Sequence, residues 1–558
     1  MKLFSGLTIL TIAMAFRVAP NPLIGQTTVV AASRYVPDYK LPMVKSPSFR
    51  KDTLSITRFG AVADGLTLNT SAIAKAIDQC NRNGGGTVLI PAGLWVTGPV
   101  ALKNNVNLHL AKGALLQFTE QRDAYPLVST TWEGEDAIRN QAPISGTDLE
   151  NIAITGEGIL DGAGDSWRMV KKSKMTDDQW KKLIASGGVL NDNKDMWYPS
   201  AQSLKGASGV MKAGQPMSYY QGIKDFLRPN MLSLTRCKRV LLEGVTFQNS
   251  PAWCLHPLLC EDITLRKVTV KNPWYAQNGD GVDLESCRNG LLENCTFDVG
   301  DDGICIKSGR DEQGRKRGIP TENIIIRNCR VYHAHGGFVI GSEMSGGVRN
   351  LYVSNCTFMG TDVGLRFKSA RGRGGIVENI FVDGVDMTDI AGEAILFDMY
   401  YAAKDPVPQH GESNDLPVIP AQPLSEATPR FRSFQIRNVR CKGAETAILI
   451  RGLPEMAVKD ILIENAVLQS RKGLVCIEAE SINLKNVALL TSAKTTMQFQ
   501  NSSNITLDKI RYADTTDLLM HITGDRSRAI NLLRTDTSHA KKIVEADANV
   551  QANALTTN

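Results

Sequence analysis

Several features that mark other classes of protein are scarce in this sequence. The charge is close to balance, with 63 lysines and arginines against 57 aspartates and glutamates, which argues against nucleic acid as a partner. There are seven histidines and no Cys-x-x-Cys pair, so we expect neither a metal site nor a cofactor. Aromatic residues make up 6% of the chain, which gives little support to a binding surface built from stacked rings.

Long apolar runs are also missing, except at the N-terminus. Met1 and Lys2 precede the apolar residues 3–16, and a basic start before a short apolar run is typical of a secretory signal peptide. The run is too short for a membrane span, and no later run approaches that length. We therefore predict a signal peptide over residues 1–30, with an uncleaved anchor as the alternative. The processed protein would be secreted or periplasmic and would have no membrane span.

The cysteines do not look like a disulfide framework. There are eleven, an odd number, and Cys295, Cys329 and Cys356 each follow an asparagine in the phrases NCTF, NCRV and NCTF. Because a free cysteine behaves as a small buried hydrophobe, we predict a stacked row of buried thiols.

A short phrase recurs along the chain and determines the expected fold. It reads VLLEGVTF from Val240, GLLENCTF from Gly290 and LYVSNCTF from Leu351. Further copies begin at Ile263, Ile324, Ile380, Phe434, Ile461, Ile482 and Ile505. Each copy alternates apolar and polar residues and is followed by turn residues. One such unit cannot bury its own apolar face, so the units must stack on one another.

This pattern predicts an all-β fold, a right-handed parallel β-helix, as a single domain over residues 31–558. The strands are not separated by helical segments, which excludes a βαβ architecture. A β-propeller is the alternative, but its blades would need about 40 or more residues each. Residues 71–83 have helical periodicity and would form an N-terminal cap. Residues 165–217 and 405–429 fit no repeat and are expected to be insertions.

Four charged turn segments follow consecutive copies of the phrase. They read NGDGVDLESC at 278–287, VGDDGICIKSG at 299–309, HAHGGFVIGSE at 333–343 and GLRFKSARGRGG at 364–375. Neighbouring coils lie about 4.8 Å apart, so equivalent segments should form one patch. The patch would hold Asp280, Asp283, Asp301, Asp302, His335, Arg366 and Lys368.

Clustered carboxyl groups suit the hydrolysis of a glycosidic bond. One carboxyl must be protonated to assist the leaving oxygen, and another must be ionised to activate water. Neighbouring negative charges raise the pKa of one of them and so keep a proton in place. Arg366 and Lys368 are two apart in a strand and point to the same side. A guanidinium beside an ammonium suits the carboxylate of a uronate.

Each motif also has an ordinary explanation when it is taken alone. NGDG and GDDG are common turn sequences, and Arg366 and Lys368 could be solvated. His333 and His335 could form a metal-binding pair at strand spacing. The coincidence of four such segments in one band favours a functional site.

The four segments resemble the signature of glycoside hydrolase family 28, the polygalacturonases and their relatives. The NTD, DD, GHG and RIK motifs of that family are similar to residues 278–280, 301–302, 335–336 and 366–368. Residues 59–65 and 84–103 are similar to the N-terminal part of bacterial pectin-degrading β-helix proteins. The resemblance covers most of the chain from about residue 54. It implies a pectin-lyase-like β-helix and an inverting hydrolase.

The resemblance also implies catalytic roles for three aspartates. Asp301 would be the general acid, while Asp280 and Asp302 would position and activate water. Inverting enzymes usually hold their acid and base carboxyls about 6.5–9.5 Å apart, and we expect side chains on adjacent coils to meet that spacing.

Other residues in the same motifs would bind the substrate. His335 would lie beside the acid, and Arg366 and Lys368 would bind the uronate. Asn278 and Lys307 are further candidates for substrate contact. The chain departs from the family pattern at three positions, with Gly279 for Thr, Ala334 for Gly and Phe367 for Ile. The second departure directly precedes His335.

By the same resemblance the substrate would be a galacturonate-containing pectic polysaccharide or oligosaccharide. Homogalacturonan is the first expectation, with rhamnogalacturonan or a substituted galacturonan as alternatives. The phrase HGGFVIGSEMSGG is more similar to bacterial exo-acting members, and the insertions at 165–217 and 405–429 would wall the groove. A calcium-dependent lyase with Asp301 and Asp302 as ligands is an alternative enzyme. A non-catalytic carbohydrate-binding solenoid is the alternative outside enzymes.

Overall fold

The structure is a computed structural model that describes residues 42–209, 214–401 and 419–557. The predicted signal peptide over residues 1–30 lies outside the described residues, as does the first part of the predicted insertion at 405–429.

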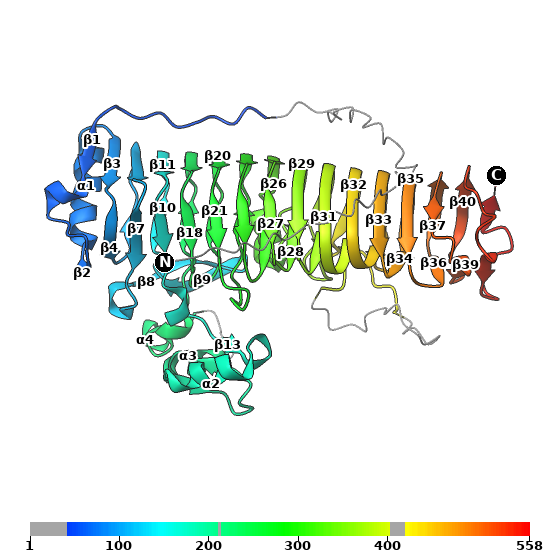
Figure 1. Cartoon of the computed structure of the whole chain (residues 1–558), viewed down its shortest axis with the longest axis horizontal. Coiled ribbons are helices and arrows are strands. Elements are labelled where there is room, and N and C mark those ends of the chain that lie inside the picture. The colour runs from blue at the N-terminus through cyan, green and yellow to red at the C-terminus, as the bar shows by residue number, and fades with distance from the viewer. Residues whose placement is uncertain (1–41, 210–213, 402–418, 558) are drawn as a thin grey trace, which may run out of the picture. The chain divides into compact units, whose positions relative to one another are not determined.

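The described chain winds into successive coils, and its strands stack in parallel rows along the length of the helix (Figure 1). One row carries the charged segments. It contains β5 (Val100–Ala101), β10 (Ile144–Thr147), β16 (Leu232–Thr235), β19 (Leu255–Leu258), β22 (Val282–Glu285), β25 (Asp302–Lys307), β28 (Gly336–Ile340), β30 (Val363–Lys368), β34 (Lys472–Ile477), β36 (Thr495–Gln500), β39 (Leu518–Thr523) and β41 (Lys542–Ala546). Between β30 and β34, the C-terminal parts of two long strands, β31 (Ile376–Asp398) and β32 (Arg430–Arg451), continue the row.

Two further rows complete each coil. The second row contains β1 (Thr53–Ser55), β3 (Gly86–Ile90), β6 (Val106–Leu110), β11 (Glu150–Gly156), β17 (Lys238–Glu243), β20 (Glu261–Arg266), β23 (Arg288–Glu293), β26 (Thr321–Arg327), β29 (Val348–Met359), β33 (Val458–Ser470), β35 (Ala479–Thr491), β37 (Ser503–Asp508), β40 (Arg528–Leu533) and β42 (Leu555–Thr557). The third contains β2 (Asp64–Leu68), β4 (Gly93–Thr97), β7 (Ala114–Phe118), β12 (Ile159–Asp161), β18 (Thr246–Gln248), β21 (Thr269–Lys271), β24 (Thr296–Asp298), β27 (Arg330–Tyr332) and β38 (Arg511–Tyr512). The strands of these three rows pair in parallel with those of the neighbouring coils, as in β17 with β20, so the predicted parallel β-helix is confirmed.

The recurring phrase forms the corner between the second and third rows. Its turn residue has a positive φ in five successive coils, at Gly244, Lys267, Asn294, Asn328 and Asn355, and four of these five residues are glycine or asparagine. Glycine and asparagine tolerate this left-handed conformation better than other residues, which explains why they recur there. The cysteine after each asparagine faces the interior. All eleven cysteines are free and buried, as the odd count suggested.

The interior is filled by the inward side chains of stacked strands. Alternate residues such as Val240 and Leu242 in β17 are fully buried, while their neighbours face outward. Near the charged segments the core contains stacked phenylalanines, with the Phe367 and Phe397 ring centroids 4.6 Å apart. This packing fixes the strands that carry the polar side chains on the outer face.

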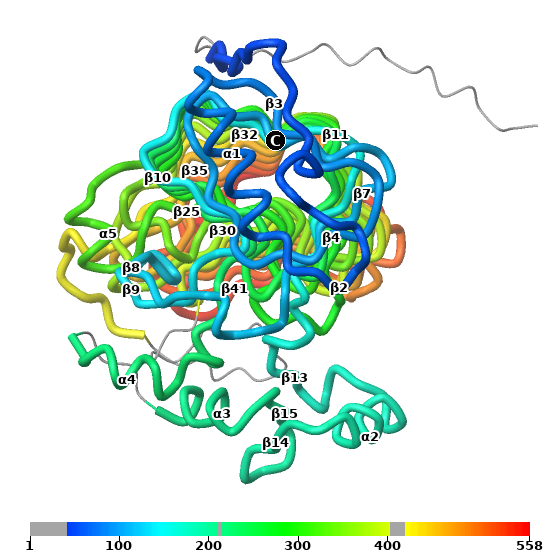
Figure 2. The backbone as a smooth tube through the Cα atoms, turned by 90° about the vertical axis from the view of Figure 1, so that its left-hand side faces the viewer, coloured from blue at the N-terminus to red at the C-terminus, as the bar shows by residue number. Residues whose placement is uncertain are grey.

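A helix closes the N-terminal end, as the periodicity predicted. Helix α1 (Thr70–Arg82) buries Ile73, Ala76 and Ile77 on one side. Viewed from that end, α1 lies across the opening of the coils (Figure 2). The helix therefore covers apolar side chains of the first coil that no further coil could cover.

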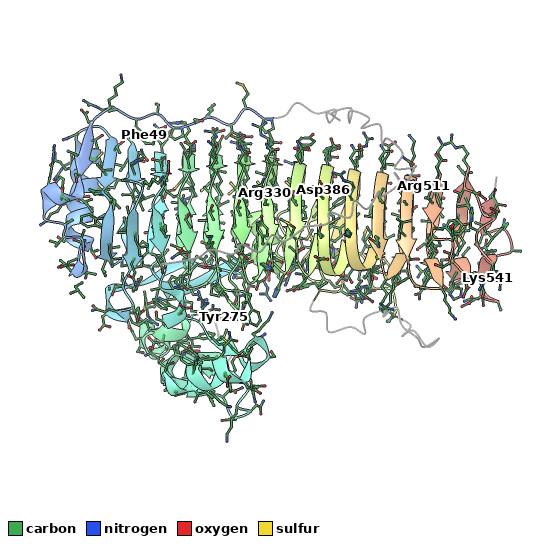
Figure 3. The ribbon with its side chains drawn as sticks, viewed as in Figure 1. Phe49, Tyr275, Arg330, Asp386, Arg511 and Lys541 are labelled. Atoms are coloured by element: carbon green, nitrogen blue, oxygen red, sulfur yellow. The ribbon has the colours of Figure 1, made fainter. Side chains whose placement is uncertain are left out.

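The excursion near residues 165–217 has a small core of its own. It contains α2 (Asp177–Ala185), α3 (Ala201–Ser208), α4 (Met217–Gln221) and an antiparallel sheet of β13 (Val170–Lys171), β15 (Met196–Tyr198) and β14 (Val189–Leu190). Trp180 and Trp197 pack together inside it. Tyr275, from a coil of the β-helix, packs against this core and donates to Asp165 at 3.4 Å (Figure 3).

A second protrusion was not expected from the sequence. Strands β8 (Leu127–Trp132) and β9 (Glu135–Asn140) form an antiparallel hairpin. Its tip reaches the segment that follows β25, where Glu133 pairs with Arg310 at 3.0 Å and the Asp136 amide donates to Gln313 in α5 (Asp311–Arg317) at 2.9 Å. The hairpin therefore crosses several coils of the row that carries the charged segments.

Candidate active site

Strand register brings the four charged segments together. In the row that carries them, Asp283 of β22 pairs with Cys305 of β25, and Cys305 pairs with Val339 of β28. Val339 in turn pairs with Arg366 of β30. Polar side chains at equivalent positions on consecutive coils thus face the same side of one sheet, as expected.

Three aspartates form the centre of this patch. Asp280, Asp301 and Asp302 each place one carboxylate oxygen within 4.8 Å of the others. This limit refers to one oxygen from each residue, whereas the expected inverting range of about 6.5–9.5 Å refers to whole carboxyl groups, so the expected spacing stays a prediction. The close approach of these oxygens has a geometric reason. Asp280 and Asp302 lie on neighbouring coils, and Asp301 directly precedes Asp302.

Asp302 is held as a carboxylate by two cations. Lys368 Nζ donates to its Oδ2 at 2.6 Å, and Arg366 Nη1 donates to its Oδ1 at 3.2 Å. Burial alone would raise the pKa of Asp302, but Lys368, Arg366 and Lys307 outweigh burial and lower it well below the usual value. Arg366 and Lys368 thus point to one side of their strand, as predicted.

The two other buried aspartates behave in the opposite way. Burial, followed by the negative charges of Asp283 and Asp301, raises the pKa of Asp280 well above its usual value. Burial likewise raises the pKa of Asp283 to about 8, although Lys307 Nζ lies 3.6 Å from its Oδ1. The site therefore combines one firmly ionised aspartate with two that retain protons.

Asp301 is the most accessible of the three central aspartates. Its side chain is 19% exposed, against 2% for Asp302. Its Oδ2 accepts from the Asn278 amide at 3.2 Å, and its Oδ1 lies 3.1 Å from His335 Nδ1. The hydrogen bond to Asp301 raises the pKa of His335 despite burial. His335 therefore lies beside Asp301, as predicted.

Lys307 is a buried member of the patch, and its ammonium group pairs with the acidic side chains of Glu343 and Asp283. It is buried, donates to Glu343 at 2.8 Å and lies 4.6 Å from the centre of the Trp253 ring. Burial would raise the pKa of Glu343, but Lys307 lowers it to about 2. The predicted contact between Lys307 and substrate stays a prediction, and the observed contacts are with Glu343, Asp283 and Trp253.

Sequence reasoning missed three residues around the patch. Arg228 donates to Asn278 Oδ1 at 2.9 Å and to the Gln277 carbonyl at 2.9 Å, which fixes the turn before Asp280. Burial lowers the pKa of Arg228 to about 10. Arg228 belongs to no repeat, so no pattern marked it. Glu343 and Trp253 stand inside or beside the repeats, and only the folded coils show what they contact.

The three carboxylates could also be considered as cation ligands. Calcium takes six to eight oxygens, and Asp280, Asp301 and Asp302 offer a cluster of them. However, both oxygens of Asp302 already accept from Lys368 and Arg366. Two fixed positive charges beside the cluster oppose a further divalent cation. The residues present therefore fit hydrolysis better than calcium binding.

Comparisons with known proteins agree with this arrangement. Residues 206–418 match the family model described as glycosyl hydrolases family 28. A hyperthermoactive exopolygalacturonase from Thermotoga maritima is 32% identical, with a TM-score of 0.62 over 76% of this chain and 89% of that chain. The chain belongs to glycoside hydrolase family 28. This family 28 member is therefore a glycoside hydrolase.

Other relatives carry related names. An exo-poly-alpha-D-galacturonosidase of Dickeya chrysanthemi is 26% identical over 479 residues, covering 82% of this chain and 74% of the relative. A probable polygalacturonase of Vitis vinifera is 26% identical over 451 residues, covering 78% and 79%. In the described part of this family 28 member, no helix is both long and apolar enough to cross a membrane.

Proposed function

We propose that this enzyme hydrolyses α-linked galacturonate chains of pectin, from a chain end and with inversion. The observation that carries the proposal is the aspartate cluster. Asp302 is kept ionised by Lys368 and Arg366, beside the two acids Asp280 and Asp301. One ionised and one protonated carboxyl at the same bond is what acid-assisted hydrolysis by water requires.

In this proposal Asp301 protonates the leaving oxygen. Its accessible side chain can reach a glycosidic bond, whereas Asp280 and Asp302 are almost completely buried. The proton passes from Asp301 to the leaving oxygen as the bond breaks. His335, hydrogen-bonded to Asp301, stabilises the resulting carboxylate and orients it.

Asp280 and Asp302 hold the attacking water. Two hydrogen bonds of about 2.7 Å each allow one water to bridge oxygens up to roughly 5 Å apart. The oxygens of these two aspartates lie within 4.8 Å of one another. A single water thus fits between the two carboxyl groups. The water gives up its proton to Asp302, the ionised member of the pair, as it attacks the anomeric carbon.

Arg366 and Tyr401 would contact the sugar beside the cleaved bond. Arg366 Nε has no hydrogen-bond partner among the described residues, although Nη1 is used by Asp302. The Tyr401 ring lies 4.7 Å from Lys368 Nζ and 5.7 Å from the Arg366 guanidinium carbon, so an aromatic face borders both cations. This combination suits a sugar ring that carries a carboxylate.

Exo action is supported by the β8–β9 hairpin rather than by the insertions considered from the sequence. The hairpin tip is tied to Arg310 and Gln313, and Trp132 stacks on Trp253 with ring centroids 5.7 Å apart. A chain running along the sheet toward the N-terminal coils would meet this hairpin. Two relatives are named as exo-acting enzymes. Since pectin is too large to enter a cell, the proposal also includes export to the periplasm or beyond.

The first experiment follows the products from polygalacturonate in the presence of a chelator. We expect saturated galacturonate or short oligomers, with inverted configuration in the first product by NMR. Asp301→Asn should lower kcat by about 10²–10⁴-fold. Asp298→Asn is the matched control, because Asp298 pairs with His333 on the exposed surface.

Unsaturated products, or activity abolished by the chelator, would favour a lyase instead. If the wild-type protein binds polygalacturonate without any turnover, the result would favour a non-catalytic carbohydrate-binding solenoid. A first product with retained configuration would overturn the inverting mechanism while leaving hydrolysis in place.

A further inference from the structure

A hollow of about 890 Å³ lies beside the aspartate cluster, on its N-terminal side. Its walls are the β8–β9 hairpin and the outer faces of β10, β16 and β19. Leu258 of β19 lines the hollow and pairs in register with Glu285 of β22, the strand that follows Asp280. Coils are about 4.8 Å apart, so the hollow begins one coil from β22, and Asp280 lies two residues before the start of that strand.

Arg139 contributes an unpaired positive charge to this hollow. It is 4% exposed, and its guanidinium lies 3.5 Å from the centre of the Trp132 ring. Among the described residues its side chain has no hydrogen-bond or ion-pair partner, and Nε is buried. Glu133, whose charge acts on Arg139, is already paired with Arg310.

An unpaired buried guanidinium is costly for a folded protein. Burial, and then the neighbouring charge of Arg228, lowers the pKa of Arg139 well below its usual value. Proteins seldom retain a buried charge unless it has a partner. An anion entering the hollow would provide the partner that the chain does not.

Three neutral polar atoms in the same walls also lack partners among the described residues. They are Thr131 Oγ1, Asn140 Oδ1 and Asn230 Oδ1, all buried. Asn140 and Asn230 are held in place through their amide nitrogens, by the Leu227 carbonyl at 2.7 Å and by His256 at 3.0 Å. Their oxygens are therefore fixed acceptors. One cation with several fixed acceptors matches a ligand with one carboxylate and several hydroxyl groups.

We propose that this hollow binds a terminal uronate of the substrate, with Arg139 holding its carboxylate and Trp132 bordering its ring. This inference rests on the proposed function, because it assigns a second sugar position to the same groove. The hairpin that closes the groove thus also supplies the charge that recognises the chain end. A chain whose last residue has lost its carboxylate charge is then a poor substrate.

The test compares trigalacturonate with two singly methyl-esterified forms, one esterified at each terminal residue. For the wild type, we expect kcat/KM to fall by about 10- to 100-fold on one of the two esters. For Arg139→Gln, kcat/KM on unmodified trigalacturonate should fall by the same factor relative to the wild type. On the discriminated ester, the kcat/KM of Arg139→Gln should equal that of the wild type. Arg139→Lys should recover part of the activity, because it restores the charge without the fork geometry.

Arg236→Gln is the matched control. Arg236 also lines the hollow, but it is half-exposed and already paired with Asp148 at 2.6 Å. Its replacement should leave the discrimination between acid and ester unchanged. A readout without turnover is the affinity for trigalacturonate of Asp301→Asn, compared with that of the double variant that carries Asp301→Asn and Arg139→Gln. The double variant should bind trigalacturonate at least 10-fold more weakly.

The outcomes separate this inference from the proposed function. If the wild type cleaves trigalacturonate but Arg139→Gln loses the same factor on all three substrates, Arg139 is structural and the inference is wrong. An unchanged Arg139→Gln enzyme would overturn it equally. If the wild type neither binds nor cleaves trigalacturonate, the proposed function fails, and the uronate assignment fails with it.

Discussion

Asp283 is a buried acid in the middle of the site, and neither of its oxygens has a hydrogen-bond partner among the described residues. Burial raises its pKa from 3.8 to about 8, against the opposing effect of Lys307. Between these two values the folded protein binds a proton that the unfolded chain releases. Stability therefore decreases as the pH rises from about 4 to about 8.

Asp283→Asn should remove this pH dependence. We expect a melting temperature above that of the wild type at pH 8, and a difference that shrinks as the pH approaches 4. Thermal unfolding measured across this range checks the prediction, with the exposed Asp298→Asn as the control. An Asp283→Asn protein that is less stable at pH 8 would contradict the raised pKa.

Asp302 should matter for stability as well as for catalysis. In Asp302→Asn, Lys368 and Arg366 lose the buried carboxylate with which they pair. Such a loss typically lowers the free energy of unfolding by about 3–5 kcal/mol. Asp301→Asn removes a more accessible carboxyl and should change stability little. Denaturant unfolding of both variants separates the roles. Equal stability would mean that the Asp302 ion pairs contribute less than their burial suggests.

At the scale of elements, the β8–β9 hairpin should decide the cleavage pattern. Removal of residues 129–138 opens the N-terminal side of the groove and also removes Trp132, the ring against which Arg139 packs. We expect the shortened enzyme to cut within the chain, so that polygalacturonate viscosity falls faster for each reducing end released.

Glu133→Gln serves as a milder variant, because it breaks only the pair with Arg310 and keeps the hairpin. It should retain the exo pattern. A shortened enzyme that still releases only end products would locate the barrier elsewhere in the groove.

Some elements could be predicted from the sequence and others could not. The cap helix was expected at residues 71–83 and is found at Thr70–Arg82, because its apolar residues follow the helical period. The hairpin gave no such signal. Its strands pair with each other instead of joining a coil, so the repeat pattern does not predict them.

At the scale of the whole molecule, the protein should be insensitive to thiol chemistry. All eleven cysteines are free and buried; ten belong to the core of the coils, and Cys305 lies 3.9 Å from Asp302. A thiol-specific reagent should not react with the native protein, and all eleven thiols should react after denaturation. A reductant should leave the melting temperature unchanged. Fewer reactive thiols in the denatured protein would show that some cysteines pair after all.

The coil and the position of the aspartates along it follow directly from the repeat. A phrase that cannot bury its own apolar face must stack, and stacking places Asp280, Asp302 and Arg366 within four consecutive coils. These are local consequences of strand alternation and coil spacing. The motifs were readable because residues equivalent in the repeat become neighbours in space.

Which side chains meet across the groove depends on contacts that the repeat does not predict. The distance between the aspartates, the pairing of Lys307 with Glu343 and the approach of Arg228 to Asn278 depend on loops whose path the repeat does not set. The same holds for Arg139, which comes 3.5 Å from Trp132 on a hairpin outside the repeat. Burial and charge balance arise from all of these contacts together, so residues distant in sequence set which acids keep their protons.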